Sequence, residues 1–134
     1  MKVLVDTTVW SIVLRHKDRP ENAATAVELA SLIQERRIAM IGPIRQEVLS
    51  GMKEPAEFER LRAYLRAFTD TELTSTDYEE AASFYNRCRQ RGIQGSSTDF
   101  LICAVAAKHD YSIFTTDVDF THFAKVLPIV FHQP

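Results

Sequence analysis

Short apolar runs alternate with longer amphipathic segments along the chain, and this alternation predicts its secondary structure. Several short runs are rich in apolar and β-branched residues, as fully buried parallel strands are. The predicted strands are residues 2–5, 38–41, 112–115 and 128–131, with residues 71–74 as a weaker candidate.

The longer segments carry apolar residues three and four positions apart, the spacing of a helix with one buried face. Ala26, Leu29 and Ile33, for example, fall on one such face. A further helix is expected to begin at Pro43 and to carry Glu47, because proline suits the first turn of a helix. The other predicted helices are residues 9–14, 23–36, 58–68, 78–88, 100–109 and 119–126.

Local signals indicate where some of these helices begin and end. Thr76 and Glu79 have the spacing of a capping box, in which two side chains bond the first backbone amides of a helix. Gly92 suits the position just past the end of the same helix. Residues 96–99 are expected to open the next helix, and Asp119 to cap the last one.

Because strands and helices alternate, the sequence predicts an α/β fold whose parallel sheet has helices on both faces. No internal repeat, low-complexity tract or linker interrupts the pattern, so residues 1–134 are expected to form a single domain. A chain of 134 residues with 46% hydrophobic residues can bury a real core without disulfides or metals as staples.

Composition excludes several classes of protein. No apolar run reaches the roughly 20 residues needed to cross a bilayer. The apolar N-terminus is too short for a signal peptide and is interrupted by Asp6, so we expect a cytoplasmic protein. Cys88 and Cys103 fall on apolar faces of predicted helices and lack the spacing of zinc ligands, which indicates buried, reduced thiols.

The acidic residues hold the most informative positions. Asp6 directly follows the first strand, and Asp117 and Asp119 follow the strand at residues 112–115. Glu47 lies in the helix after the second strand, and Asp99 lies in the first turn of a helix. Because ligands of parallel α/β sheets bind at the carboxyl ends of the strands, these acids can all reach one edge of the sheet.

Carboxylates gathered in this way need a counter-charge. Two of them about 5 Å apart repel by roughly 3 kcal/mol at an effective dielectric constant of about 20. Neither Arg45 nor Lys108 is obviously placed to neutralise them. Hard oxygen ligands without His or Cys favour Mg²⁺ or Mn²⁺, and such an open site suits phosphodiester hydrolysis by a metal-activated water.

The same residues resemble four motifs of the PIN domain family. "VLVDTTVW" from Val3, "PIRQEVLSG" from Pro43, "SSTDFLICAVA" from Ser96 and "IFTTDVDF" from Ile113 occur in the family's order and span nearly the whole chain. The compact length is similar to that of VapC toxins, the nuclease half of VapBC toxin–antitoxin modules.

The resemblance implies a three-layer α/β/α sandwich around a mainly parallel sheet of about five strands. It also implies an endoribonuclease that depends on Mg²⁺ or Mn²⁺. By motif position Asp6 and Asp99 would bind the metal directly, Asp117 would complete the set, and Glu47 would orient the water or hold a second metal. Asp119 would join the metal site or only cap the last helix.

The resemblance further implies partners: an RNA substrate, a VapB-like antitoxin protein and a second copy of the chain in a homodimer. Three alternatives remain open at this stage. The chain could be a catalytically inactive PIN-like module that binds RNA or protein, a PIN nuclease of RNA maturation, or, less well matched, a Mg²⁺-dependent phosphotransfer or receiver domain. The sequence does not identify the RNA that is cleaved, because RNA is recognised largely by shape.

Several other side chains could have either a functional or a purely structural role. The hydroxyls of Thr7, Ser97 and Thr115 can hydrogen-bond the carboxylates or serve only as turn and cap residues. Trp10 is expected in the core or at a dimer interface. The basic clusters at Arg36–Arg37 and at Arg87, Arg89 and Arg91 are solvated surface or contacts for RNA phosphates, despite a net charge of −2.

Overall fold

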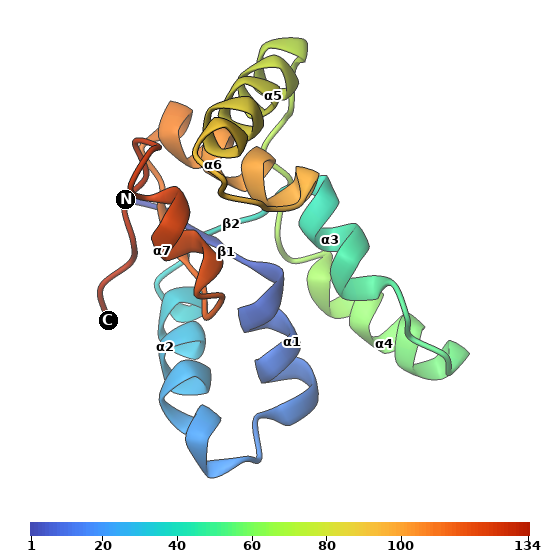
Figure 1. Cartoon of the computed structure of the whole chain (residues 1–134). Helices are drawn as coiled ribbons and strands as arrows, with labels where there is room; N and C mark the ends of the chain where they lie inside the picture. Colours follow the sequence, from blue (N-terminus) through green and yellow to red (C-terminus); the bar gives the residue numbers. More distant parts are fainter.

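A computed structural model describes residues 1–134 and has three layers. A parallel sheet in the order β2-β1-β3 forms the middle layer. Figure 1 shows α1 and α2 below this sheet and α5 and α6 above it, while α3 and α4 extend to one side. The strands are β1 (Val3–Val5), β2 (Ile38–Ala39) and β3 (Ser112–Phe114). The helices are α1 (Thr7–His16), α2 (Ala23–Gln34), α3 (Gly42–Leu49), α4 (Pro55–Leu65), α5 (Ser75–Gln90), α6 (Ser97–His109) and α7 (Asp119–Phe123), with a 3₁₀ turn η1 at Pro20–Asn22.

The sheet has three strands, not the predicted five. Residues 128–131 reach the sheet through one isolated bridge, Ile113 with Phe131, and residues 71–74 follow directly on another, Met40 with Asp70. Pro128 has no amide to donate to a ladder, which limits pairing at that edge. The two segments therefore cover the outer strands without extending the sheet, and the predicted α/β architecture is otherwise confirmed.

The order β2-β1-β3 has a direct consequence for the site. The chain leaves β1 for β2 on one side and later returns to β3 on the other side of β1. The strand order therefore reverses beside β1, and such a switch point opens a crevice at the carboxyl ends of the strands. The amide of Asp6 donates to the Phe114 carbonyl at 2.9 Å, so the ends of β1 and β3 remain paired where the acids begin.

Helix α6 is the most deeply buried helix of the fold. All seven residues from Phe100 to Ala106 are buried, because α6 lies between β3 and α5 and also contacts α7 through the ring of Phe123. A helix that is apolar all round belongs inside a protein. No helix of the chain is both long enough and apolar enough to span a membrane.

The start of α5 differs from its prediction. Thr74 and Asp77 form the capping box, and Thr76 with Glu79 does not. Asp77 is buried and also forms an ion pair with Lys108 at the end of α6, at 3.1 Å. This contact between helices selects the earlier of two matching sequence patterns. Gly92 follows the end of α5 as predicted, with a φ of 73° that favours glycine.

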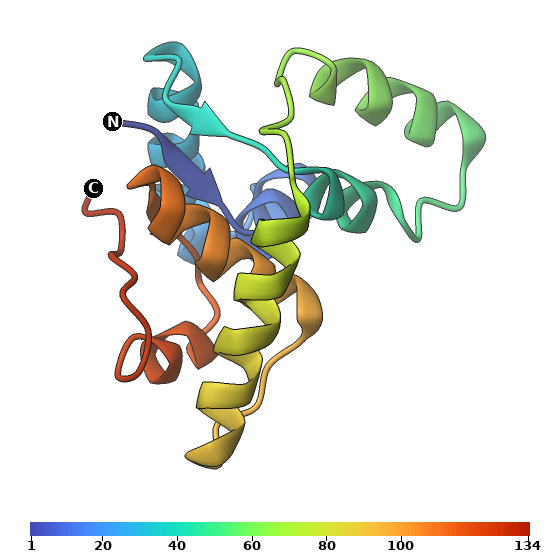
Figure 2. The same cartoon turned by 90° about the horizontal axis from the view of Figure 1, so that it is seen from above.

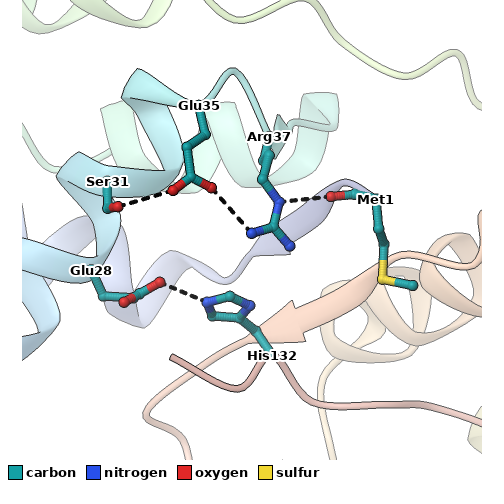
Figure 3. Close-up of polar contacts among 6 residues, drawn as sticks. All are labelled: Met1, Glu28, Ser31, Glu35, Arg37 and His132. Carbon is teal, nitrogen blue, oxygen red and sulfur yellow. Dashed lines mark hydrogen bonds and ion pairs between the residues drawn. The ribbon is translucent and has the colours of Figure 1, made fainter.

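The carboxyl-terminal segment is fastened to α2. His132 Nε2 lies 2.9 Å from Glu28 Oε1, and the His132 side chain is only 5% exposed (Figure 3). Nearby, Arg37 bonds the Met1 carbonyl at 2.9 Å and pairs with Glu35 at 3.2 Å. These contacts join both ends of the chain to the α2–β2 region, and the His132 amide also bonds the Ile113 carbonyl of β3 at 2.9 Å.

Arg45 fixes α3 against the end of α4. Its guanidinium pairs with Asp70 at 2.8 Å and donates to the carbonyls of Leu65 and Phe68. The α3–α4 pair projects from the body of the molecule (Figure 2), and it is anchored by the buried side chains of Ile44 and Val48 on α3 and of Leu61 and Leu65 on α4. Because α3 carries Glu47, Arg45 also fixes the place of that acid.

We expect Arg45→Ala to lower the free energy of unfolding by about 2 kcal/mol, since it removes a charged donor from two carbonyls and a carboxylate. Urea unfolding measures the change. Arg62→Ala is the matched control, because Arg62 forms only an exposed pair within α4 and its loss should cost about 0.5 kcal/mol or less. Equal losses in the two variants would contradict this role for Arg45.

Candidate active site

Three of the five predicted acids lie at or beside the carboxyl ends of β1 and β3. Asp6 follows β1, Asp117 lies in the turn after β3, and Asp99 stands in the first turn of α6. Burial is the largest cause that raises the pKa values of Asp99 and Asp6. The negative charges of Asp6 and Asp117 further raise the pKa of Asp99, and that of Asp117 further raises the pKa of Asp6. These three carboxylates therefore form one electrostatic group, which we call the acidic cluster.

Asp6 is the most buried member of the cluster, with 4% of its surface exposed. Its Oδ2 accepts hydrogen bonds from the hydroxyls of Thr8 and Thr115, both at 2.8 Å. Burial raises the pKa of Asp6, and these hydroxyl bonds together with the Thr7 amide oppose the rise. Although Asp6 holds the N-cap position of α1, its side chain does not cap that helix. The carboxylate instead faces the end of β3.

Asp99 is held by the start of α6. Its Oδ2 accepts the Ser96 amide at 3.0 Å, and its own amide donates to the Ser96 hydroxyl at 3.1 Å. Burial raises the pKa of Asp99, and the charges of Asp6 and Asp117 add to the rise. Ser97, for which both a carboxylate contact and a plain cap role were open, is exposed and does not bond a carboxylate. The contact belongs to its neighbour Ser96.

Glu47 lies at the rim of the site. The Thr7 hydroxyl donates to Glu47 Oε1 at 2.7 Å and so joins α3 to the first turn of α1. The side chain of Glu47 is exposed, whereas Asp6 is buried and Asp99 is half-buried. The structure thus brings Glu47 to the first turn of α1, but not into the acidic cluster.

Asp117 and Asp119 differ in their environments. Asp117 is half-buried, its amide donates to the Thr115 hydroxyl at 3.0 Å, and its Oδ1 accepts the Asp119 amide at 2.9 Å. Asp119 is exposed and is the first residue of α7, whose N-cap is Val118, so the predicted capping by Asp119 is wrong. The carboxylate that bonds a backbone amide at the start of α7 is that of Asp117, which precedes the helix.

No cation of the protein neutralises the acidic cluster. Arg45 is held by Asp70, and Lys108 by Asp77, both away from it. The donor set consists of carboxylate and hydroxyl oxygens, which suits a hard divalent ion. As the side chains lie, however, no three His, Cys, Asp or Glu residues form a group that could hold a metal ion. Binding of one ion by all three carboxylates would therefore require at least one side chain to rotate.

The remaining sequence predictions concern the core. Cys88 and Cys103 are both buried and unpaired, as expected, and burial raises the pKa of both thiols. Trp10 is fully buried and packs edge-on against Phe68, which places it in the core. Thr8 is the site residue that sequence reasoning missed. Its signal was its position two residues after Asp6, within the first motif.

Comparison with known proteins identifies a matching family and a relative of similar length. Residues 3–126 match the PIN domain family. Ribonuclease VapC11 of Mycobacterium tuberculosis is 30% identical over 128 residues, which cover 92% of this chain and 92% of the relative.

Solved structures share the fold. VapBC2 from Rickettsia felis, bound to a DNA fragment from its promoter, matches with a TM-score of 0.78 at 15% identity and covers 98% of each chain. A toxin–antitoxin complex from Klebsiella pneumoniae matches with a TM-score of 0.63 at 20% identity, over 89% of this chain and 90% of the other. At such identities the likeness concerns the fold.

The raised pKa of Asp6 and the lowered pKa of Asp77 predict opposite effects on stability. Burial makes ionised Asp6 unfavourable in the folded state. The fold is therefore most stable with respect to Asp6 below the ordinary pKa of 3.8, where the side chain is protonated, and it loses this stability as pH rises through the folded pKa. Asp77, whose pKa is lowered chiefly by the Thr74 amide, stabilises the fold above 3.8, and this stability is lost as pH falls through its folded pKa.

In EDTA at pH 7.5 we therefore expect Asp6→Asn to raise the free energy of unfolding and Asp77→Asn to lower it. The Asp6→Asn difference should shrink as the pH falls toward 4, whereas the Asp77→Asn difference should largely persist at pH 4, because the folded pKa of Asp77 lies below 3.8. Urea unfolding at pH 7.5, 6, 5 and 4 measures them. A destabilised Asp6→Asn protein at pH 7.5 would contradict the view that ionised Asp6 is held at a cost in folding free energy.

Proposed function

Since the chain belongs to the PIN domain family, we propose that it is an endoribonuclease that depends on Mg²⁺ or Mn²⁺ and acts as the toxin of a toxin–antitoxin module. The observation that carries this proposal is the acidic cluster: three carboxylates share one edge of the sheet with no Lys or Arg among them. Buried like charges without a counter-charge are costly in folding free energy, and active sites are where such arrangements recur.

Asp6, Asp99 and Asp117 would hold the ion. Asp99 and Asp117 each use one oxygen to accept a backbone amide, which leaves the other oxygen for a metal. A bound Mg²⁺ or Mn²⁺ would lower the pKa of a water and stabilise charge on the leaving oxygen. Asp119 is a further ligand only if it turns inward from its exposed position.

Glu47 has a different role in this proposal. It is exposed at the rim, beside the cluster but outside it, and Thr7 holds one of its oxygens. From there it would orient the attacking water and accept its proton. A general base of this kind must lie within hydrogen-bonding reach of the water that it activates.

RNA is the proposed substrate because the relative VapC11 is a ribonuclease and matches this chain over nearly its whole length. The structural relative from Klebsiella pneumoniae is a toxin–antitoxin complex, which supports a VapB-like antitoxin as the partner of this chain. We also propose that the chain forms a homodimer and acts in the cytoplasm.

Cleavage of a total-RNA pool with Mg²⁺, Mn²⁺ or EDTA tests the nuclease. We expect cleavage with either ion and none with EDTA, and a loss of at least ~100-fold in Asp6→Asn, Asp99→Asn and Asp117→Asn, because each removes a proposed metal ligand. Asp18→Asn is the matched control, since Asp18 is exposed on the turn after α1, and it should cleave as the wild type does.

Two outcomes would decide against parts of this proposal. If the folded wild-type protein neither cleaves RNA nor binds Mn²⁺ by calorimetry, an inactive PIN-like binding module replaces the nuclease. If Asp119→Asn loses activity and Asp117→Asn keeps it, the assignment of the third metal ligand moves from Asp117 to Asp119.

The toxin role has its own test. We expect induction of the chain alone in a bacterial host to arrest growth, and Asp6→Asn to abolish the arrest. Co-expression of a short DNA-binding protein encoded beside this chain should restore growth, and that protein should co-purify with the chain. Normal growth with an active, well-expressed nuclease would favour a role in RNA maturation instead.

A further inference from the structure

Two threonine hydroxyls connect Asp6 to the turn that carries Asp117. The Thr8 hydroxyl donates to Asp6 Oδ2 at 2.8 Å and accepts the Thr116 amide at 3.3 Å. The Thr115 hydroxyl donates to the same oxygen at 2.8 Å and accepts the Asp117 amide at 3.0 Å. Two successive amides of the turn are therefore bound, each through one hydroxyl, to a single carboxylate oxygen.

Each of these hydroxyls has one proton, and the geometry assigns that proton to Asp6. The oxygen lone pairs then face the turn and accept its amides, so both chains of hydrogen bonds run from amide to hydroxyl to carboxylate. With Oδ2 occupied twice, Oδ1 is the oxygen of Asp6 without a side-chain partner.

The two threonine hydroxyls bridge different separations along the chain. Thr115 precedes the turn in the chain, so its bonds to Asp117 are local. Thr8 belongs to the first turn of α1 and is separated from Thr116 by 108 residues. Its hydroxyl is thus the only side-chain group of α1 that bonds the Asp117 turn directly. A local turn alone would leave the distance between α1 and Asp117 less firmly fixed.

We propose that Thr8 is a positioning residue of the acidic cluster, whose hydroxyl sets the orientation of Asp6 and the place of the Asp117 turn together. This inference rests on the proposed function in so far as the two carboxylates share a metal ion. The required group is a hydroxyl that can donate and accept at once. Serine should therefore replace Thr8, and valine, which has the same shape without the hydroxyl, should not.

The first measurement needs neither metal nor RNA. In Thr8→Val the Thr116 amide loses its acceptor, so we expect its hydrogen exchange, followed by NMR in EDTA, to become about tenfold faster. Thr8→Ser should restore the protection of the wild type. Thr25→Val is the matched control, because Thr25 is half-buried on α2 and its hydroxyl bonds no other group of the protein. It should leave the Thr116 amide unchanged.

The second measurement concerns the metal. Loss of a group that orients a metal ligand typically weakens affinity or activity by about 10- to 100-fold. We expect Thr8→Val to raise the Kd for Mn²⁺, measured by calorimetry, by about tenfold and to lower kcat with little change in the KM for RNA. Thr8→Ser should retain both values within about twofold.

The outcomes separate this inference from the nuclease proposal. Unchanged Thr116 exchange in Thr8→Val would overturn the positioning role, whatever the enzyme does. Faster exchange with unchanged Mn²⁺ affinity and kcat in an active enzyme would overturn the link from position to function. Faster exchange in a chain whose wild type binds no Mn²⁺ would support the coupling and reject the proposed metal-dependent nuclease.

Discussion

The Asp6 carboxylate is buried at the end of β1 without a cation beside it, and the surrounding elements are arranged to hold it there. Two hydroxyls and a backbone amide compensate in part for the lost hydration. The pairing of β1 with β3 brings one of those hydroxyls from the far end of the chain. Asp99 and Asp117 then add negative charge beside it. The fold therefore tolerates carboxylates without a counter-charge at this edge of the sheet. Buried Asp77, by contrast, has its lysine.

Much of the fold and of the site follows from the sequence because both depend on simple periodicities and on one topological rule. The apolar runs located all three strands, and the rule that parallel strands present their carboxyl ends together was enough to gather Asp6, Asp99 and Asp117. The number of strands was overestimated because a short apolar segment has the same sequence pattern whether or not it pairs with a neighbouring strand. Residues 128–131 pair through one bridge only.

The finer details depend on contacts that no local pattern contains. Thr74 with Asp77 and Thr76 with Glu79 both have the spacing of a capping box, and only the ion pair with Lys108 on another helix selects the first. Asp119 stands where a helix cap was expected, but the turn before it places Asp117 there instead. The role of Thr8 depends on a backbone amide more than a hundred residues away. Sequence can name candidates for such contacts, whereas the packing of distant segments chooses among them.

The all-round burial of α6 also bears on how this chain can change during evolution. Seven successive residues of α6 touch other parts of the protein on every side, so each is restricted in size and polarity by packing. If residues 100–106 are invariant among homologues, the cause would therefore be tight packing in the interior. A role in the site would not be needed to explain it, although the segment begins next to Asp99. The projecting α4 has exposed faces and is free to diverge. Differences between related chains in what they bind are more readily acquired there, without disturbing the interior that holds the acids.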